Sequence, residues 1–274
     1  MDWFQALVLG IVEGVTEYLP VSSTGHLILA QRALGIPSSD AADAYAIVIQ
    51  AGAILAVLGI YLGRIHRMAR GVLGRDPEGR RLALALLLAL LPAVLVAAPL
   101  EHVVKAHLFA LRPIVAAWAL GGIAILLVDA RRRRNGLGPQ AGLPLESLAW
   151  HGALIIGAFQ VLAVWPGTSR SLVTILGGLA VGLSMTAAVE FSFLLGVVTL
   201  GGATLLDVLN HGPTMLREYG WAPLLIGFVA AFAAAEVAVR WMIGYVVRRG
   251  MAVFGWYRIA LAIVVSALLS SGIL

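Results

Sequence analysis

Apolar residues form ten runs along the 274-residue chain, and the lengths of the runs repeat. In the first half, two short runs precede three long ones, at 4–18, 24–35, 44–63, 82–100 and 112–129. The second half has the same order, at 147–164, 171–183, 186–208, 221–240 and 253–272. A spanning helix needs about 20 apolar residues, so we expect only the long runs to cross a membrane.

Each pair of short runs meets at a polar tip marked by Pro20 or by Pro166-Gly167. Two short helices joined in this way are typical of a re-entrant hairpin, which enters the membrane and leaves on the same side. Irregular backbone at that depth is tolerated only where it is buried in protein or lines a wet cavity. We therefore predict an all-α integral membrane protein with six transmembrane helices and two re-entrant helix hairpins.

The two halves also match in sequence, since Gly10-x-x-Glu13 corresponds to Gly157-x-x-Gln160 and Pro20-Val-Ser-Ser to Pro166-Gly-Thr-Ser. An odd number of crossings in each half gives the halves opposite orientations. We predict one membrane domain over 1–274, with inverted repeat one at about 1–130 and inverted repeat two at about 147–274. Such repeats commonly build a site near the membrane midplane. The Gly10-x-x-x-Gly14 spacing is typical of close helix packing.

Composition supports a membrane location. The chain is 61% hydrophobic and 12% charged, its mean hydropathy is +0.96, and a soluble domain carries roughly 25% charged residues. Without cysteine there is no disulfide and no thiolate metal site. The start, Met1-Asp2-Trp3-Phe4, lacks the cationic residues of a cleavable signal peptide, so none is expected.

Arginine placement predicts the topology. Thirteen basic residues fall in three loops on one side, namely Arg64, Arg67, Arg70, Arg75, Arg80, Arg81, Arg131, Arg132, Arg133, Arg134, Arg240, Arg248 and Arg249. The other side holds Arg32, Lys105, Arg112 and Arg217. By the positive-inside rule both termini lie outside, with the first hairpin entering from outside and the second from inside.

The first tip concentrates reactive groups in an apolar chain. The stretch Glu13-Gly-Val-Thr-Glu17-Tyr-Leu-Pro-Val-Ser-Ser-Thr-Gly-His26 holds two carboxylates, consecutive hydroxyls and an imidazole. Ionisable groups at membrane depth cost several kcal/mol and mark functional sites. Glu13 and Glu17 share one helix face, so one is protonated or a cation or arginine compensates them. For either carboxylate alone, pairing for packing is the alternative.

The second tip supplies a matching set. Thr168, Ser169 and Arg170 follow Pro166, as Ser22, Ser23 and Thr24 follow Pro20. Such hydroxyls cap helices, but a helix N-terminus in a dry cavity also attracts an anion. Two such termini and Arg170 predict a pocket for phosphate, which a guanidinium binds bidentately.

These motifs resemble those of a known family. The first tip and Pro166-Gly-Thr-Ser-Arg170-Ser are similar to the two signature motifs of undecaprenyl-pyrophosphate phosphatases, the bacitracin-resistance proteins of bacteria. Similarity continues through Val48-Ile-Gln50, Glu190-Phe-Ser and Tyr257-Arg258, while Leu172 departs from the family's usual glycine. The resemblance implies hydrolysis of undecaprenyl diphosphate to undecaprenyl phosphate and inorganic phosphate, which recycles the lipid carrier of peptidoglycan synthesis. It also implies a bacterial plasma-membrane location and a site open to the periplasmic or extracellular face.

The tips and the resemblance together give the expected site. The expected catalytic residues are Glu13, Glu17, Ser23, His26 and Arg170. The expected substrate-binding residues are Ser22, Thr24, Thr168, Ser169 and Arg258. Mg²⁺ or Ca²⁺ held by Glu13 and Glu17 is a further hypothesis.

Several alternatives stay open at this point. Ser23 or His26 attacks phosphorus, or one of them activates water. The expected partners are a polyprenyl diphosphate and membrane lipid, with no nucleic acid, and a homodimer is undecided. The rival function is a lipid-phosphate transporter or flippase that uses the same pocket, and the buried charges disfavour a purely structural protein.

Overall fold

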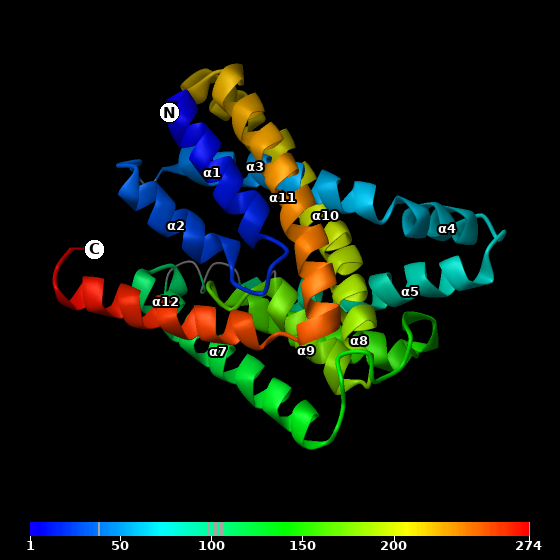
Figure 1. Cartoon of the computed structure of the whole chain (residues 1–274). Coiled ribbons are helices and arrows are strands. Elements are labelled where there is room, and N and C mark those ends of the chain that lie inside the picture. Colours follow the sequence, from blue (N-terminus) through cyan, green and yellow to red (C-terminus); the bar gives the residue numbers. More distant parts are fainter. Residues whose placement is uncertain (38, 98, 101–103, 105–106, 274) are drawn as a thin grey trace.

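The computed structural model describes residues 1–37, 39–97, 99–100, 104 and 107–273, so Lys105 of the topology count lies outside it. The described residues form a helical protein without named strands (Figure 1). The helices of the first half are α1 Trp3–Thr16, α2 Ser23–Ala33, α3 Asp40–Ile60, α4 Leu62–Val72, α5 Pro77–Pro92 and α7 Leu111–Arg134. Those of the second half are α8 Trp150–Val161, α9 Arg170–Ala180, α10 Met185–Tyr219, α11 Trp221–Arg249 and α12 Ala252–Ser270.

The chain is a multi-pass membrane protein by the length and polarity of its helices. Five described segments are long and apolar enough to cross a membrane, namely Pro77–Val96, Leu111–Arg134, Met185–Leu206, Trp221–Arg249 and Ala252–Ser270. A sixth is present if α3 and α4, which meet at an 80° bend, count as one span. Large apolar side chains such as Leu127, Val237 and Ile263 are exposed on these helices, as expected for surfaces that face lipid.

Two shorter helix pairs, α1 with α2 and α8 with α9, occupy the predicted short runs. In each pair the second helix starts after a serine with an unusual backbone. Ser22 has φ 75° and Ser169 has φ 76°, and they are the only residues other than glycine with positive φ in the described part of the chain. Residues other than glycine rarely adopt this backbone conformation. The same strained turn is therefore present in both tips.

Glycines bring helices from opposite halves into close contact. A Cβ on Gly10 would lie 2.4 Å from the carbonyl oxygen of Gly227, and one on Gly14 would lie 2.3 Å from that of Ala231, so α1 packs directly on α11. The prediction of close packing through Gly10 and Gly14 is confirmed. In the second half, a Cβ on Gly157 would meet the carbonyl oxygen of Ala89 at 2.4 Å, which places α8 on α5. Helix α3 packs on α10, and α7 packs on α12.

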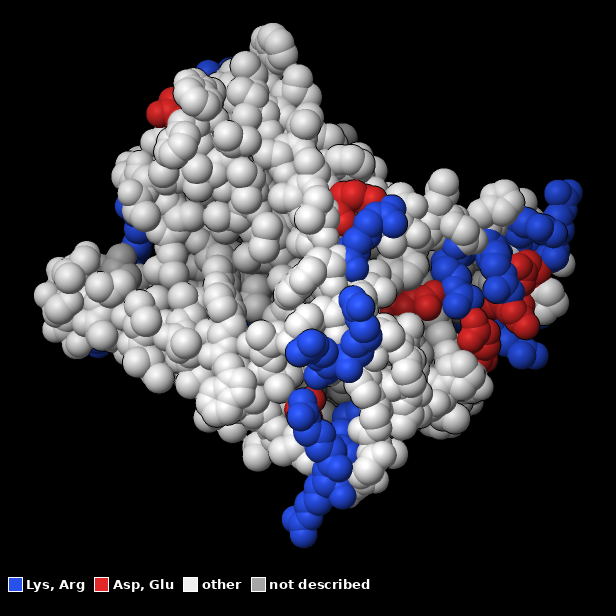
Figure 2. Space-filling view, in the orientation of Figure 1, with Lys and Arg blue, Asp and Glu red and all other residues white. Residues whose placement is uncertain are grey.

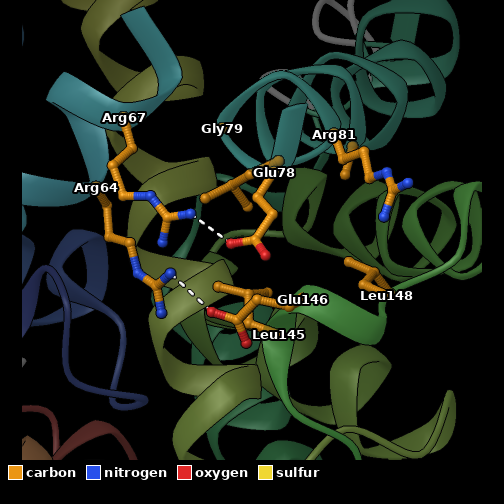
Figure 3. Close-up of a pocket in the computed structure, with 10 residues that line it drawn as sticks. Arg64, Arg67, Glu78, Gly79, Arg81, Leu145, Glu146 and Leu148 are labelled. Carbon is orange, nitrogen blue, oxygen red and sulfur yellow. Dashed lines mark hydrogen bonds and ion pairs between the residues drawn. The ribbon is translucent and has the colours of Figure 1, made fainter. Parts of the chain in front are cut away.

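Charge is confined to a few regions of the surface. Lysine and arginine gather at the bend and turn around α4 and α5 and where α7 and α11 end, while most of the visible face is uncharged (Figure 2). At the first region Arg64 and Arg67 face Glu146 and Glu78 across a small pocket (Figure 3).

The ion pairs of this region also involve Glu190 and Asp76. Glu190, which belongs to one of the motifs similar to the family's, pairs with Arg64 at 2.5 Å, and Arg64 reaches Glu146 at 2.8 Å. The carboxylate of Asp76 accepts from the backbone N–H of Gly79 at 2.9 Å and from Arg67 at 3.1 Å. These bonds lower the pKa of Asp76 below the ordinary value of 3.8. Four carboxylates thus compensate the charges of Arg64 and Arg67.

Candidate active site

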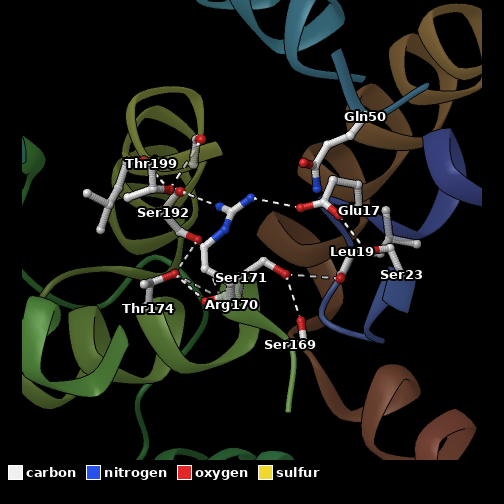
Figure 4. Close-up of polar contacts among 12 residues, drawn as sticks. Glu17, Leu19, Ser23, Gln50, Ser169, Arg170, Ser171, Thr174, Ser192 and Thr199 are labelled. Atoms are coloured by element: carbon white, nitrogen blue, oxygen red, sulfur yellow. Dashed lines mark hydrogen bonds and ion pairs between the residues drawn. The ribbon is translucent and has the colours of Figure 1, made fainter. Parts of the chain in front are cut away.

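Glu17 joins the two tips. It lies directly after α1, and its Oε2 accepts a hydrogen bond from Ser23 Oγ at the start of α2. Its Oε1 accepts from Arg170 Nη2 at 3.2 Å, across 153 positions of sequence (Figure 4). The side chains of Glu17 and Arg170 are 6% and 11% exposed. The structure therefore brings together the carboxylate and hydroxyl of the first tip and the arginine of the second.

The guanidinium of Arg170 lies between the backbone of α10 and an aromatic ring. Its Nη1 donates to the carbonyl oxygen of Ser192 at 3.0 Å. A Cβ on Gly196 would lie 2.1 Å from Nη1, so α10 provides room for the group only because residue 196 has no side chain. On the other side, Cζ of Arg170 lies 5.2 Å from the centre of the buried Tyr18 ring, within cation–π range.

Buried hydroxyls bond the second tip to the first. Ser171 Oγ donates to the carbonyl oxygen of Leu19 at 3.0 Å and lies 2.9 Å from Ser169 Oγ. Thr174 Oγ1 lies 2.6 Å from Ser192 Oγ (Figure 4). Ser169 also caps α9, because its Oγ accepts from the N–H of Leu172.

Sequence reasoning missed Ser171, Thr174 and Ser192. They could have been found as hydroxyl residues on otherwise apolar helices. Ser171 and Thr174 are close in sequence to Arg170, and Ser192 lies on α10, which packs on the helix of Arg170.

Arg258 ties both tips to α7. It is completely buried on α12. Its Nη1 donates to the carbonyl oxygen of Pro20 at 3.1 Å, and its Nη2 donates to those of Gly167 and Ala117 at 2.9 Å each. A further bond runs from Nε to the carbonyl oxygen of Trp118 at 3.3 Å. The sequence predicted Arg258 as a substrate-binding residue, and the structure places its guanidinium against backbone carbonyls.

His26 faces α12. Its Nδ1 lies 2.6 Å from the carbonyl oxygen of Ser22, and its Nε2 lies 2.7 Å from the hydroxyl of Tyr257, whose ring stacks on the imidazole. A carbonyl only accepts, so Nδ1 carries a proton and donates to the Ser22 carbonyl. The hydroxyl of Ser23 donates to Glu17 rather than to His26. Tyr257 was noticed in the sequence only as part of a similar motif.

A cavity of about 460 Å³ lies beside the Glu17–Ser23 pair. Its polar lining comes from Glu13, Ser23, Thr24, Gln31 and Gln50, and its apolar lining comes from Leu27, Ile28, Ala46, Ile47 and Phe109. A cavity lined by both polar and apolar side chains suits an amphiphilic ligand. Ser22 is buried at the N-cap of α2, and Thr168 is half-buried in the second tip.

Glu13 is a buried carboxylate at the edge of this cavity. It is 1% exposed, and neither of its oxygens has a hydrogen-bond partner among the described residues. Gln50, across the cavity, accepts from Thr204 Oγ1 at 3.2 Å. A buried oxygen without a partner is costly, so Glu13 requires a proton, a cation or a donor from a ligand.

Comparison with known proteins places the chain in a family. The model of the bacitracin resistance protein BacA family matches residues 6–264. A protein of Sorangium cellulosum named undecaprenyl-diphosphatase is 46% identical over 267 residues, which cover 97% of this chain and 86% of that protein. An undecaprenyl-diphosphatase 2 of Rhodospirillum rubrum is 43% identical, with 98% of this chain and 96% of that protein covered. One of Deinococcus deserti is 41% identical, with 100% and 98% covered. With both polar tips inside the matched region, the chain belongs to the bacitracin resistance protein BacA family.

Proposed function

We propose that the protein is a phosphatase that hydrolyses undecaprenyl diphosphate to undecaprenyl phosphate and inorganic phosphate. The observation that carries the proposal is the buried Ser23–Glu17–Arg170 chain of contacts beside an amphiphilic cavity. It combines a hydroxyl nucleophile, a base and a cation for phosphate, which are the parts that phosphoryl transfer needs. The relatives are named as diphosphatases, which supports hydrolysis over the transporter considered from the sequence.

Ser23 is the nucleophile in the proposed reaction. Glu17 Oε2 takes the proton from Ser23 Oγ as that oxygen bonds to the terminal phosphorus. The bond between this phosphorus and the bridging oxygen breaks, and undecaprenyl phosphate leaves. Water then attacks the phosphoserine, and Glu17 returns the proton to Ser23 Oγ as inorganic phosphate leaves. One water molecule is consumed over the cycle, and the side chains return to their starting state.

Arg170 supplies the positive charge that stabilises the transferring phosphoryl group in this proposal. Its guanidinium has a fixed position against Gly196 and Tyr18, so little reorganisation is needed when negative charge builds up on the transferring phosphoryl group. Thr24, Thr168, Ser169 and the backbone N–H groups at both helix starts bind the phosphate oxygens in this proposal.

The remaining residues of the site act through others. Arg258 positions the tips through the carbonyls of Pro20 and Gly167, and His26, fixed by the Ser22 carbonyl and Tyr257, holds the first turn of α2. Both are positioning residues in this proposal.

A divalent cation fits the donor set at the head of the cavity. Buried Glu13 has two oxygens without a protein partner, and carboxylate and phosphate oxygens are the ligands that Mg²⁺ and Ca²⁺ prefer. Glu13 and Glu17 would hold the cation, which would neutralise charge on the bound diphosphate. No group of three or more acidic or histidine side chains suited to a metal occurs among the described residues, so substrate oxygens would complete the coordination.

We also propose the finer topology expected from the sequence. The two short helix pairs are re-entrant, the bent α3–α4 pair supplies the sixth span, and the halves are inverted repeats. The matching contacts of α1 with α11 and of α8 with α5, together with the identical turns at Ser22 and Ser169, support this arrangement. Both termini then lie outside, and the cavity opens to the periplasmic or extracellular face, where the enzyme recycles the carrier for peptidoglycan synthesis and confers bacitracin resistance.

Phosphate release in detergent tests the function. The purified protein is incubated with undecaprenyl diphosphate in mixed micelles, where no membrane barrier exists, with and without EDTA. We expect steady release from the wild type, at least a hundredfold loss in Ser23→Ala and Arg170→Ala, and an acid-stable label on Ser23 after quenching with ³²P-labelled substrate. Binding without release would support transport instead, and near-normal turnover of Ser23→Ala would exclude Ser23 as the nucleophile.

A further inference from the structure

A second cavity, of about 580 Å³, lies away from the tips, where α7 and α11 end and α12 begins. Arg132 and Arg133 reach it from α7, and Arg248 and Arg249 reach it from α11. Figure 2 shows basic side chains gathered on this part of the surface. The proposed reaction uses none of these residues, since the catalytic contacts lie between the two tips.

The positive charge of this cavity is largely uncompensated. Asp129 is the one carboxylate in its lining, and it pairs with Arg133 at 2.7 Å. Arg248 uses only Nε, which donates to the carbonyl oxygen of Gly244 at 2.8 Å. In the described part of the chain neither Arg248 nor Arg249 has an acidic partner. Two guanidinium groups are therefore available to an anion.

Hydrogen bonds from Arg132 fix one wall of this cavity. Arg132 Nη2 donates to the carbonyl oxygens of Gly138 and Ala141 at 3.0 and 2.9 Å, which holds the segment after α7 against the opening. The residues next to Arg132 and Arg133 on the same helix, Arg131 and Arg134, do not line the cavity. The positive-inside rule needs only the number of arginines, so it does not explain why some of them converge on one cavity.

The N-terminus of α12 points to the same ligand chemistry. The chain turns at Gly250, with φ 75°, and α12 begins at Ala252, which lines the cavity together with Val253. Met251 occupies the N-cap position and offers no side-chain acceptor, so the first turn of this 19-residue helix has no side-chain cap. Uncapped N–H groups and the helix dipole favour an anion at this position.

We propose that this cavity is a binding site for the phosphate group of an anionic phospholipid, separate from the catalytic cavity. The cavity lies at the ends of apolar helices rather than in a detached loop region, where lipid headgroups are found. Next to it, Tyr245 of the lining stacks with the exposed Trp241, and aromatic residues of this kind sit at headgroup level. Basic pockets between membrane helices bind phosphate headgroups.

Native mass spectrometry of the purified full-length protein tests the site. The protein is titrated with phosphatidylglycerol in detergent, and the bound lipid is counted for the wild type, Arg248→Gln/Arg249→Gln and the matched control Arg131→Gln/Arg134→Gln. Both arginine pairs lie at the C-terminal ends of their helices, and both double variants remove two positive charges. We expect the affinity for the first bound lipid to fall on the order of tenfold or more only in the Arg248/Arg249 variant. Equal affinity in all three proteins, or an equal loss in both variants, overturns the proposal.

A competition arm distinguishes the two sources of phosphate. Inorganic phosphate at millimolar concentration is added to the wild type loaded with phosphatidylglycerol. Retention of the lipid supports a headgroup site, and its displacement overturns the lipid assignment in favour of free phosphate. Because phosphatidylglycerol is not hydrolysed in the proposed reaction, failure of this experiment leaves the diphosphatase proposal untouched.

Discussion

Substitution of Gly196 by alanine tests whether the fixed position of Arg170 matters for catalysis. In Gly196→Ala the new Cβ would lie 2.1 Å from Arg170 Nη1 and 2.5 Å from Cζ. Ordinary contact begins near 3.4 Å, so the guanidinium must withdraw by roughly 1 Å or more. Its bond to Glu17, already 3.2 Å long, does not survive such a shift in its present geometry.

The size of the effect follows from the role of the guanidinium. A misplacement of about 1 Å in a catalytic constellation costs roughly a hundredfold in rate, and loss of one preorganised donor costs about 10²–10³. We therefore expect kcat/KM of Gly196→Ala to fall about a hundredfold, which corresponds to about 2.7 kcal/mol of transition-state stabilisation. Folding should survive, because alanine is a better helix former than glycine by about 1 kcal/mol.

The assay is phosphate release from undecaprenyl diphosphate in micelles, with Gly202→Ala as the matched control. Gly202 lies on the same helix, and a Cβ there has open space within 4 Å. The control should keep the activity of the wild type, and both variants should unfold in detergent at or above the wild-type temperature. Activity of Gly196→Ala within threefold of the control would refute the argument that α10 positions Arg170.

Three further predictions concern positioning and pH. Arg258→Met leaves carbonyls of both tips without a donor and should destabilise the protein by about 3–5 kcal/mol; an unchanged unfolding curve in detergent would contradict this. Tyr257→Phe removes the bond to His26 and should lower kcat about fivefold. The same substitution in a His26→Gln background should cause no further loss. Additive losses would disprove that Tyr257 acts through His26. The Gly79 N–H and, next, Arg67 lower the folded pKa of Asp76, so these contacts with the carboxylate stabilise the fold above pH 3.8 and this stabilisation is lost as pH falls through the folded pKa. Asp76→Asn should thus be less stable than wild type at pH 7 and equal to it in acid, and a deficit independent of pH would exclude the linkage.

The long apolar runs located most helices because a lipid environment leaves few ways to fold. A backbone in hydrocarbon must satisfy its own hydrogen bonds, so an apolar run of about 20 residues forms a helix. The run at 44–63 was an exception, because it does not continue as one straight helix. The helix ends at Ile60, and α4 turns away by 80°. The arginines of α4 pair with Glu146, Glu190 and the acidic residues of the next turn, and these polar contacts favour the bend between α3 and α4.

The polar tips predicted the candidate site, but the contact partners of each side chain follow only from the three-dimensional packing. His26 lies three residues after Ser23 on α2, yet its Nε2 bonds to the hydroxyl of Tyr257, 231 positions away. The sequence predicted Arg258 as a substrate-binding residue, but the carbonyl oxygens that it contacts belong to segments up to 238 positions away. Such contacts depend on how α7, α12 and the tips dock, and no local pattern records that docking.

The strained serines explain why both tips begin their second helix as they do. At Ser22 and Ser169 a positive φ costs energy that glycine would avoid, yet both positions keep a hydroxyl. Ser169 uses it to cap α9 and to bond Ser171, which in turn holds the Leu19 carbonyl of the other tip. Ser22 instead offers its carbonyl to His26. In each tip the residue that directly follows the strained serine contacts Glu17, namely Ser23 through Oε2 and Arg170 through Oε1.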